Sequence, residues 1–181
     1  MSRNEPAAQI MPAAPQYYFE DFPPGLVIET PAVTFSAGEI IEFASRYDPQ
    51  VFHTDPDRAR QSAFGGLIAS GWHTASIAMR LICDTYLLKA ASIGSPGVKD
   101  LRWLKPVRPG DAMRIRMTVE ESRPSSSKPD RGAVTHRWEG FNQHGEKVLE
   151  MHGVGLFFRR PAPAAGGAGT PLPAAPAGSR T

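Results

Sequence analysis

The second half of the chain shows a polar–apolar alternation with a period of two. Between residues 112 and 121, apolar side chains occupy every other position, and arginine, threonine or glutamate fills most positions between them. Successive side chains of a strand point to opposite faces, so this pattern predicts a half-buried strand. The composition also predicts strands over 98–104, 133–142 and 147–159. Gln143-His144-Gly145 predicts a hairpin turn between the last two.

Helical periodicity appears in the first half of the chain. Ser36 followed by Glu39 has the form of a capping box and predicts a helix that ends near Tyr47. A longer helix is expected over 71–91. Its apolar positions fall on one side at helical spacing: Ala75, Ala78, Met79, Ile82, Tyr86 and Leu87. The other expected elements are a strand over 26–35, a short helix over 57–61 and a loop over 92–97.

The order of these elements indicates the fold class. Helices come first and most of the strands follow as a group, which favours an α+β fold over a doubly wound parallel sheet. A long central helix wrapped by an antiparallel sheet would bury both apolar faces. Alanines near the start of the long helix indicate close packing against a flat surface such as a sheet.

The two ends of the chain are poor core material. The chain has 181 residues, and the stretches 1–15 and 161–181 are rich in alanine, proline, glycine and small polar residues. Such segments bury too little apolar surface to offset the entropy lost on ordering, so we expect both to be flexible. The remaining 16–160 is long enough for one domain with a core of its own.

Charge and cysteine content exclude several classes of protein. The net charge is +2, from 20 basic and 18 acidic side chains, which gives no electrostatic case for nucleic-acid binding. Cys83 is the single cysteine, and the N-terminus lacks the basic and then apolar run of a signal peptide, so we expect a cytoplasmic protein. His73, Arg80 and Asp84 interrupt the most apolar helix, so no membrane span is expected.

The residues suited to acid/base chemistry lie between residues 47 and 73. Asp48 and His53 lie five residues apart, and proline after Asp48 predicts that the preceding helix ends there. Ser70-Gly71 opens the long helix about twenty residues later. A helix start offers unpaired N–H groups and a positive dipole end. A carboxylate, an imidazole and free N–H groups are suited to acid/base work on a carbonyl compound.

Several of these residues also have a structural interpretation. Asp48 is suited to a turn before proline and Ser70 to a helix cap, as is Asp55 before Pro56. Gly71 is suited to close helix packing as well as to catalysis. Aromatic residues at a helix start commonly pack against neighbouring side chains, and this interpretation is open to Trp72 and to His73. The residues expected to bind substrate are Gln50, Phe52, Ser70 and Trp72.

No metal site or nucleotide loop is predicted. Cys83 has no His or Cys at a spacing typical of zinc, and Gly65-Gly66 alone is suited to a turn. His136, His144 and His152 have no partner spacing and are given no role. Arg102, Lys105 and Arg108 are expected on a solvated rim, where one of them is a candidate for contacting phosphates.

The motif residues carry a resemblance to a known family. Asp48-Pro49-Gln50-Val51-Phe52-His53-Thr54-Asp55, followed by Gly66-Leu67-Ile68-Ala69-Ser70-Gly71, resembles the hydratase motif of the MaoC-like, or (R)-specific enoyl-CoA hydratase, family. The turn from Leu104 to Asp111 is similar to part of the same family's sheet. The resemblance covers about 17–160. It implies a hotdog fold, in which a curled antiparallel sheet wraps a long helix, usually paired into a dimer.

The resemblance also implies an activity and roles for three residues. The implied reaction is reversible addition of water across the double bond of a trans-2-enoyl thioester. Asp48 and His53 match the catalytic pair, and Gly71 matches the glycine whose N–H holds the thioester oxygen. The family usually has Asp-x-Asn-Pro-x-His, whereas here proline follows Asp48 directly and Gln50 stands at the Asn position. This departure concerns the substrate range more than the reaction type.

Three functions therefore stay open from the sequence. The first is the hydratase or dehydratase, the second a hotdog thioesterase, and the third a non-catalytic acyl-thioester binder. Fold alone does not decide among these three functions. The intact pair of Asp48 and His53 favours the first. No cofactor is expected beyond coenzyme A as part of the substrate. The expected partners are an acyl-CoA or acyl-carrier thioester and a second copy of the chain in a homodimer or higher oligomer.

Overall fold

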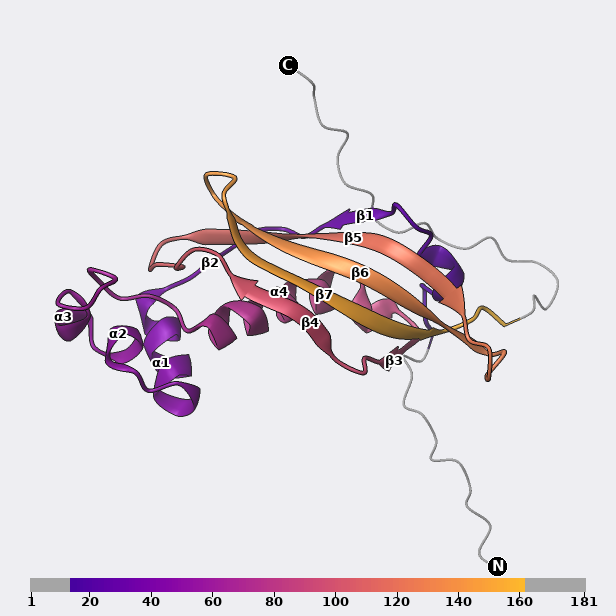
Figure 1. The fold of residues 1–181 in the computed structure, drawn as a ribbon, viewed down its shortest axis with the longest axis horizontal. Helices are drawn as coiled ribbons and strands as arrows, with labels where there is room; N and C mark the ends of the chain where they lie inside the picture. Colours follow the sequence, from indigo (N-terminus) through magenta and orange to yellow (C-terminus); the bar gives the residue numbers. More distant parts are fainter. Residues whose placement is uncertain (1–13, 162–181) are drawn as a thin grey trace, which may run out of the picture.

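The computed structural model describes residues 14–161 as an α+β unit in which a curled antiparallel sheet covers a long helix (Figure 1). This is the architecture predicted from the order of the elements and from the resemblance. The expected flexible segments, 1–15 and 161–181, lie almost entirely outside the described residues. Over residues 14–161, no helix is both long and apolar enough to cross a membrane.

The described sheet has seven strands, with β1, β5, β6, β7 and β3 in that spatial order. Strand β2 also pairs with β5, and β4 also pairs with β7, so each outer position is shared by two short strands. The strands are β1 (Val27–Glu29), β2 (Val33–Thr34), β3 (Ser92–Gly94), β4 (Val98–Trp103), β5 (Ala112–Pro124), β6 (Arg131–Asn142) and β7 (Lys147–Phe158). The four strands expected from the second half of the chain are present.

Two expectations about the sheet were wrong. Thr30 and Pro31 split the strand expected over 26–35 into β1 and β2. Pro31 has no N–H to donate to the sheet, and the Thr30 hydroxyl accepts a hydrogen bond from the N–H of Ile115 at 2.9 Å. The loop expected over 92–97 begins instead with β3, because Ser92 and Gly94 pair with β7.

The helices are α1 (Ala37–Tyr47), α2 (Val51–Thr54), α3 (Pro56–Ala59) and α4 (Gly71–Thr85), with short 3-10 turns η1 (Phe19–Asp21) and η2 (Leu87–Lys89). The predicted capping box is present, since the Ser36 hydroxyl accepts from the Glu39 N–H at 3.2 Å. α4 ends at Thr85 and not near residue 91. Tyr86, with φ of −147°, leaves the helical region as its ring enters the core. The sequence analysis did not predict α2.

α4 lies along the inner face of the sheet (Figure 1). Ala78, Ile82 and Tyr86 are buried there, as predicted, together with the inward-facing residues of β5, β6 and β7. Met79 was expected on the same buried side but is 40% exposed, and Trp72 is 58% exposed. Both line a cavity between α4 and the β3–β4 side of the sheet, which the described residues leave partly open.

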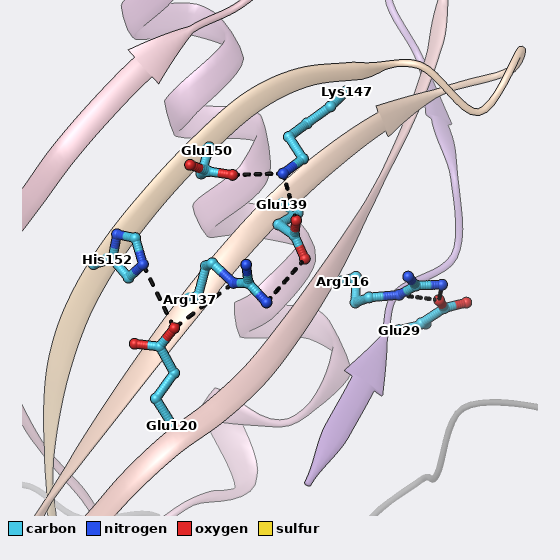
Figure 2. A network of polar contacts seen from close by, with 8 residues as sticks. All are labelled: Glu29, Arg116, Glu120, Arg137, Glu139, Lys147, Glu150 and His152. Carbon is cyan, nitrogen blue, oxygen red and sulfur yellow. Dashed lines mark hydrogen bonds and ion pairs between the residues drawn. The ribbon is translucent and has the colours of Figure 1, made fainter. Parts of the chain in front are cut away.

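The outer face of the sheet carries a network of charged side chains (Figure 2). Lys147 contacts both Glu139 (2.6 Å) and Glu150 (2.5 Å), while Arg137 lies 3.8 Å from Glu139. Glu139 is only 8% exposed, so these cations balance a carboxylate that has lost most of its water. His152, which was given no role, lies 3.5 Å from another carboxylate of this network, that of Glu120.

α1, α2 and α3 gather beyond one end of the sheet, near the start of α4 (Figure 1). The segment that follows α3 is anchored at two points. The Ile68 N–H donates to the carbonyl of Phe52 (3.1 Å), and the Ala69 N–H donates to that of Val107 (2.8 Å). This anchoring brings residues 48–55, from a turn between helices, against Ser70 and Gly71.

Candidate active site

Asp48 lies at the point where α1 stops. Its backbone has left the helical region (φ −154°, ψ 67°), as expected for the residue before proline, yet its N–H still donates to the carbonyl of Ala44 at 2.9 Å. This geometry turns the Asp48 side chain away from the helix and toward the start of α4. The side chain is 19% exposed, so the carboxylate retains limited access to solvent.

His53 is the buried residue of α2, and its ring is fixed from one side. Nδ1 lies 2.8 Å from the carbonyl oxygen of Ile68. A carbonyl oxygen only accepts hydrogen bonds, so Nδ1 carries the hydrogen and Nε2 of the neutral ring is left with a lone pair. Nε2 faces Asp48 Oδ2 at 3.4 Å. Two proton-accepting atoms therefore point at the same small space.

The Asp48 carboxylate accepts two hydrogen bonds that hold it in this position. The Ser70 hydroxyl donates to Oδ2 at 2.7 Å, and the Gln50 side-chain amide donates to Oδ1 at 2.7 Å. Burial raises the pKa of the Asp48 carboxyl, but these two hydrogen bonds and the nearby His53 together outweigh burial and hold the pKa below its ordinary value. Asp48 is therefore ionised at neutral pH.

Gly71 is the first residue of α4, where the N–H has no partner within the helix and the helix dipole is positive. The Trp103 ring lies directly against it. A β-carbon at this position would lie 2.6 Å from Cδ2 of Trp103, so packing also requires glycine here. The two interpretations of Gly71 are thus compatible. The sequence analysis missed Trp103, because only the pairing of β4 with β7 brings this ring to the helix start.

The four residues expected to bind substrate fall into two groups. Gln50 and Ser70 are directed at Asp48, and Ser70 also caps α4 by accepting from the Trp72 N–H at 3.2 Å. Phe52 packs edge-on against the His53 ring, with 4.5 Å between centroids, and Trp72 packs edge-on against Trp103 at 5.4 Å. Gln50 and Ser70 thus position the carboxylate, whereas Phe52 packs on the His53 ring and Trp72 lines the cavity beside α4.

Two further residues, Asp55 and His73, have the structural roles that the sequence analysis offered for them. Asp55 caps α3, accepting from the N–H groups of residues 57 and 58. His73 is buried and stacks on Phe43 with 4.7 Å between ring centroids, and burial lowers the pKa of His73. It is therefore a neutral core residue.

The basic residues of the predicted rim have different surroundings. Lys105 forms an ion pair with Glu146, and Arg108 donates to the carbonyl of Phe64 at 2.7 Å. Arg102, on the outer strand β4, forms no ion pair with any described residue. Between residues 14 and 161, no three His, Cys, Asp or Glu side chains cluster as they would around a metal ion.

A cavity of about 350 Å³ adjoins the start of α4. One wall is the side of α4 that carries Trp72, Ala75 and Met79, and the other is formed by β3, β4, β6 and β7. Ala75 and Met79 follow Gly71 at intervals of four residues, so all three share one face of the helix. Trp72 is the one cavity residue that the sequence analysis named as a substrate contact.

Comparisons with known proteins identify the family of this chain. Residues 21–138 match the family model described as MaoC like domain. The YdeM protein of Bacillus subtilis is 29% identical over 131 residues, which cover 72% of this chain and 92% of YdeM.

Two solved structures are similar over most of the described residues. The crystal structure of a MaoC-like dehydratase from Rhodospirillum rubrum is 42% identical, with a TM-score of 0.74, and the match covers 80% of this chain and 99% of that one. An (R)-hydratase from A. caviae is 26% identical, with a TM-score of 0.60 and coverages of 72% and 93%. The chain therefore belongs to the MaoC-like dehydratase family and has its hotdog fold.

Proposed function

We propose that this chain adds water reversibly across the double bond of a trans-2-enoyl thioester. The observation that carries the proposal is the pair of proton-accepting atoms, His53 Nε2 and Asp48 Oδ2, that face each other at 3.4 Å beside the start of α4. Membership of the MaoC-like dehydratase family and similarity to an (R)-hydratase support hydro-lyase chemistry in general. The substrate and the roles of individual residues are our inference.

Gly71 is the proposed oxyanion donor. Its free N–H, at the positive end of α4, would hold the thioester oxygen and withdraw electron density from the conjugated double bond. The β-carbon then becomes the electrophile. The Trp103 ring packs against Gly71 and so borders this site.

Asp48 and His53 are the proposed acid/base pair. One water between them would donate a hydrogen bond to each, because both the carboxylate and the lone pair of Nε2 accept. One group takes a proton from the water as its oxygen attacks the β-carbon. This proton, held by the pair, is then delivered to the α-carbon, so that both groups return to their starting state. Each proton-transfer step of this kind contributes roughly 10²–10⁴-fold to the rate.

We also propose that the acyl chain extends from Gly71 into the cavity beside α4, and that Arg102 contacts the phosphates of coenzyme A or of an acyl carrier. The apolar lining of the cavity supports the first assignment, and the absence of an ion pair to Arg102 within residues 14–161 supports the second. A cytoplasmic location and the absence of a cofactor stay predictions.

A homodimer is proposed from the outer strand β4. Val98, Trp103 and Leu104 are about half exposed, next to the exposed ring of Trp72. The edge of β4 that faces away from β7 has no partner strand among the described residues. A second copy that pairs along this edge would cover both the apolar side chains and the mouth of the cavity.

The test is hydration of a short trans-2-enoyl-CoA, followed by loss of the conjugated thioester absorbance. We expect Asp48→Asn and His53→Gln each to reduce kcat/KM by at least about 100-fold. The matched controls are Asp57→Asn and His144→Gln, which change the same residue types at exposed positions and should retain activity. Full activity in either dyad variant would contradict the proposal, and release of free thiol would point to a thioesterase.

A further inference from the structure

The strand β7 contributes two glycines to the lining of the cavity beside α4. Gly153 and Gly155 both line it. A β-carbon on Gly153 would lie 2.7 Å from Cε1 of His136, and one on Gly155 would lie 2.7 Å from Cε2 of Phe157. The rings of His136 and Phe157 therefore lie over bare backbone, and the space beside them stays open.

Polar groups without partners occur in the lining of this otherwise apolar cavity. His136 is 8% exposed and Trp138 is 6% exposed, and neither His136 Nδ1 nor Trp138 Nε1 has a hydrogen-bond partner among the described residues. The Tyr86 ring is 1% exposed, and its hydroxyl makes no hydrogen bond within residues 14–161. Buried polar groups are ordinarily paired, so the unpaired atoms of His136 and Trp138 indicate a missing ligand, and the Tyr86 hydroxyl lines the same cavity.

These groups are uncharged. Among the residues that the structure describes, no Lys, Arg, Asp or Glu lines the cavity. Burial, as the largest effect, lowers the pKa of His136, and burial raises that of Tyr86, so the imidazole and the phenol are both neutral at pH 7. A carboxylate placed here would lose its water without gaining a cation, which is strongly unfavourable. An uncharged group such as a hydroxyl would instead pair with the imidazole or with the phenol without this cost.

The position of His136 sets its distance from the reacting end. In the register of the sheet, Trp103 of β4 pairs with Leu149 of β7. Val98 of β4 pairs with Gly153 of β7, and Gly153 also pairs with His136 of β6. Four residues of strand separate these two positions on β7, or roughly 13 Å along the sheet. A group held at His136 is therefore far from the double bond and belongs to the distal part of an acyl chain.

We propose that the acyl group bound by this protein carries a hydroxyl or another uncharged polar group on its distal part, recognised by His136 and Tyr86. This inference rests on the proposed function only in taking the cavity ligand to be an acyl thioester. It narrows the substrate class to medium-length, polar-substituted acyl chains, and it disfavours both simple alkyl chains and chains that end in a carboxylate.

The test is calorimetric titration with three saturated acyl-CoA thioesters of equal length that end in a methyl, a hydroxyl or a carboxylate group. Saturated chains bind without reacting, so the measurement does not depend on Asp48 or His53. We expect the hydroxyl chain to bind about tenfold more tightly than the methyl chain, the factor given by one hydrogen bond of ordinary strength. The carboxylate chain should bind most weakly.

Tyr86→Phe and His136→Phe should each remove most of the tenfold preference, while His144→Phe, on the exposed hairpin turn, should retain it. Tyr86→Phe removes only the hydroxyl, so it remains a valid test if the His136 variant does not fold. Equal binding of methyl and hydroxyl chains by the unaltered protein, or an unchanged preference in folded Tyr86→Phe, would overturn the inference. Hydroxyl preference without hydration of any enoyl-CoA would instead contradict the proposed reaction alone.

Discussion

The substitution Ser70→Ala tests how the Asp48 carboxylate is held. Ser70 is fully buried, and its hydroxyl has two roles. It donates to Asp48 Oδ2 at 2.7 Å, and it accepts from the Trp72 N–H at 3.2 Å as the cap of α4. Alanine removes both hydrogen bonds without adding volume, so the effects on stability and on ionisation both follow from one missing oxygen atom.

The loss of stability can be estimated from the two contacts. A serine cap replaced by alanine costs about 1 kcal/mol. A hydrogen bond to a charged group contributes about 1.5–3 kcal/mol, and the lower end applies because Asp48 keeps its bond to Gln50 and some access to solvent. Together these terms predict a decrease of about 2–3 kcal/mol in the free energy of unfolding, measured by urea denaturation at pH 7.

The ionisation of Asp48 changes in a defined direction. The pKa of Asp48 lies below its ordinary value in the folded protein. The ionised carboxylate therefore stabilises the fold at pH values above its unfolded-state pKa. This contribution is lost as the pH falls through the lower, folded-state value. Ser70→Ala removes a hydrogen bond that lowers the pKa, so the folded-state pKa rises. The acid limb of kcat/KM for enoyl-CoA hydration should therefore move to higher pH.

The matched control is Ser45→Ala. Ser45 lies in α1, and its hydroxyl donates only to the carbonyl of Ile41 in the same helix. This variant should keep both the acid limb and most of the stability. An acid limb that does not move in folded, active Ser70→Ala protein would contradict the proposed part of the Asp48 carboxylate in acid/base catalysis.

Three further predictions concern other contacts. Gly71→Ala should abolish hydration and lower the melting temperature, because its β-carbon meets the ring of Trp103; Gly71→Ala with full activity would contradict the packing. Glu139→Gln should lower the free energy of unfolding by about 1–3 kcal/mol, because Lys147 loses its buried partner, and unchanged urea denaturation would show that the pair is unimportant. Val98→Arg should convert the proposed dimer to a monomer in light scattering, and an unchanged mass would place the interface elsewhere.

Local patterns carried much of what the sequence predicted correctly. The capping box at Ser36, the alternation along β5 and the proline after Asp48 each act within a few residues, so they can be recognised without tertiary contacts. The motif that joins Asp48 to His53 is also short. The Gln50 hydrogen bond to Asp48 spans only two residues, and it comes from the residue that stands at the Asn position of the family motif.

Features set by the register of the sheet could not be predicted in this way. Trp103 reaches Gly71 only because β4 pairs with β7, and the Ser70 hydroxyl finds Asp48 across 22 residues of chain. Helical spacing placed Met79 on the buried side, but it does not reveal that the sheet leaves this side of α4 partly open. The split of the first strand did have a local signal in Pro31, which was overlooked.

The most direct test of the account is the identity of the product. Purified protein would be incubated with a trans-2-enoyl-CoA, and the thioester products would be analysed by mass spectrometry while free thiol is measured in parallel. The account predicts a 3-hydroxyacyl-CoA, heavier than the substrate by one water, with no release of thiol. Free coenzyme A together with an intact enoic acid would contradict it, because water would then have attacked the thioester carbonyl and not the β-carbon.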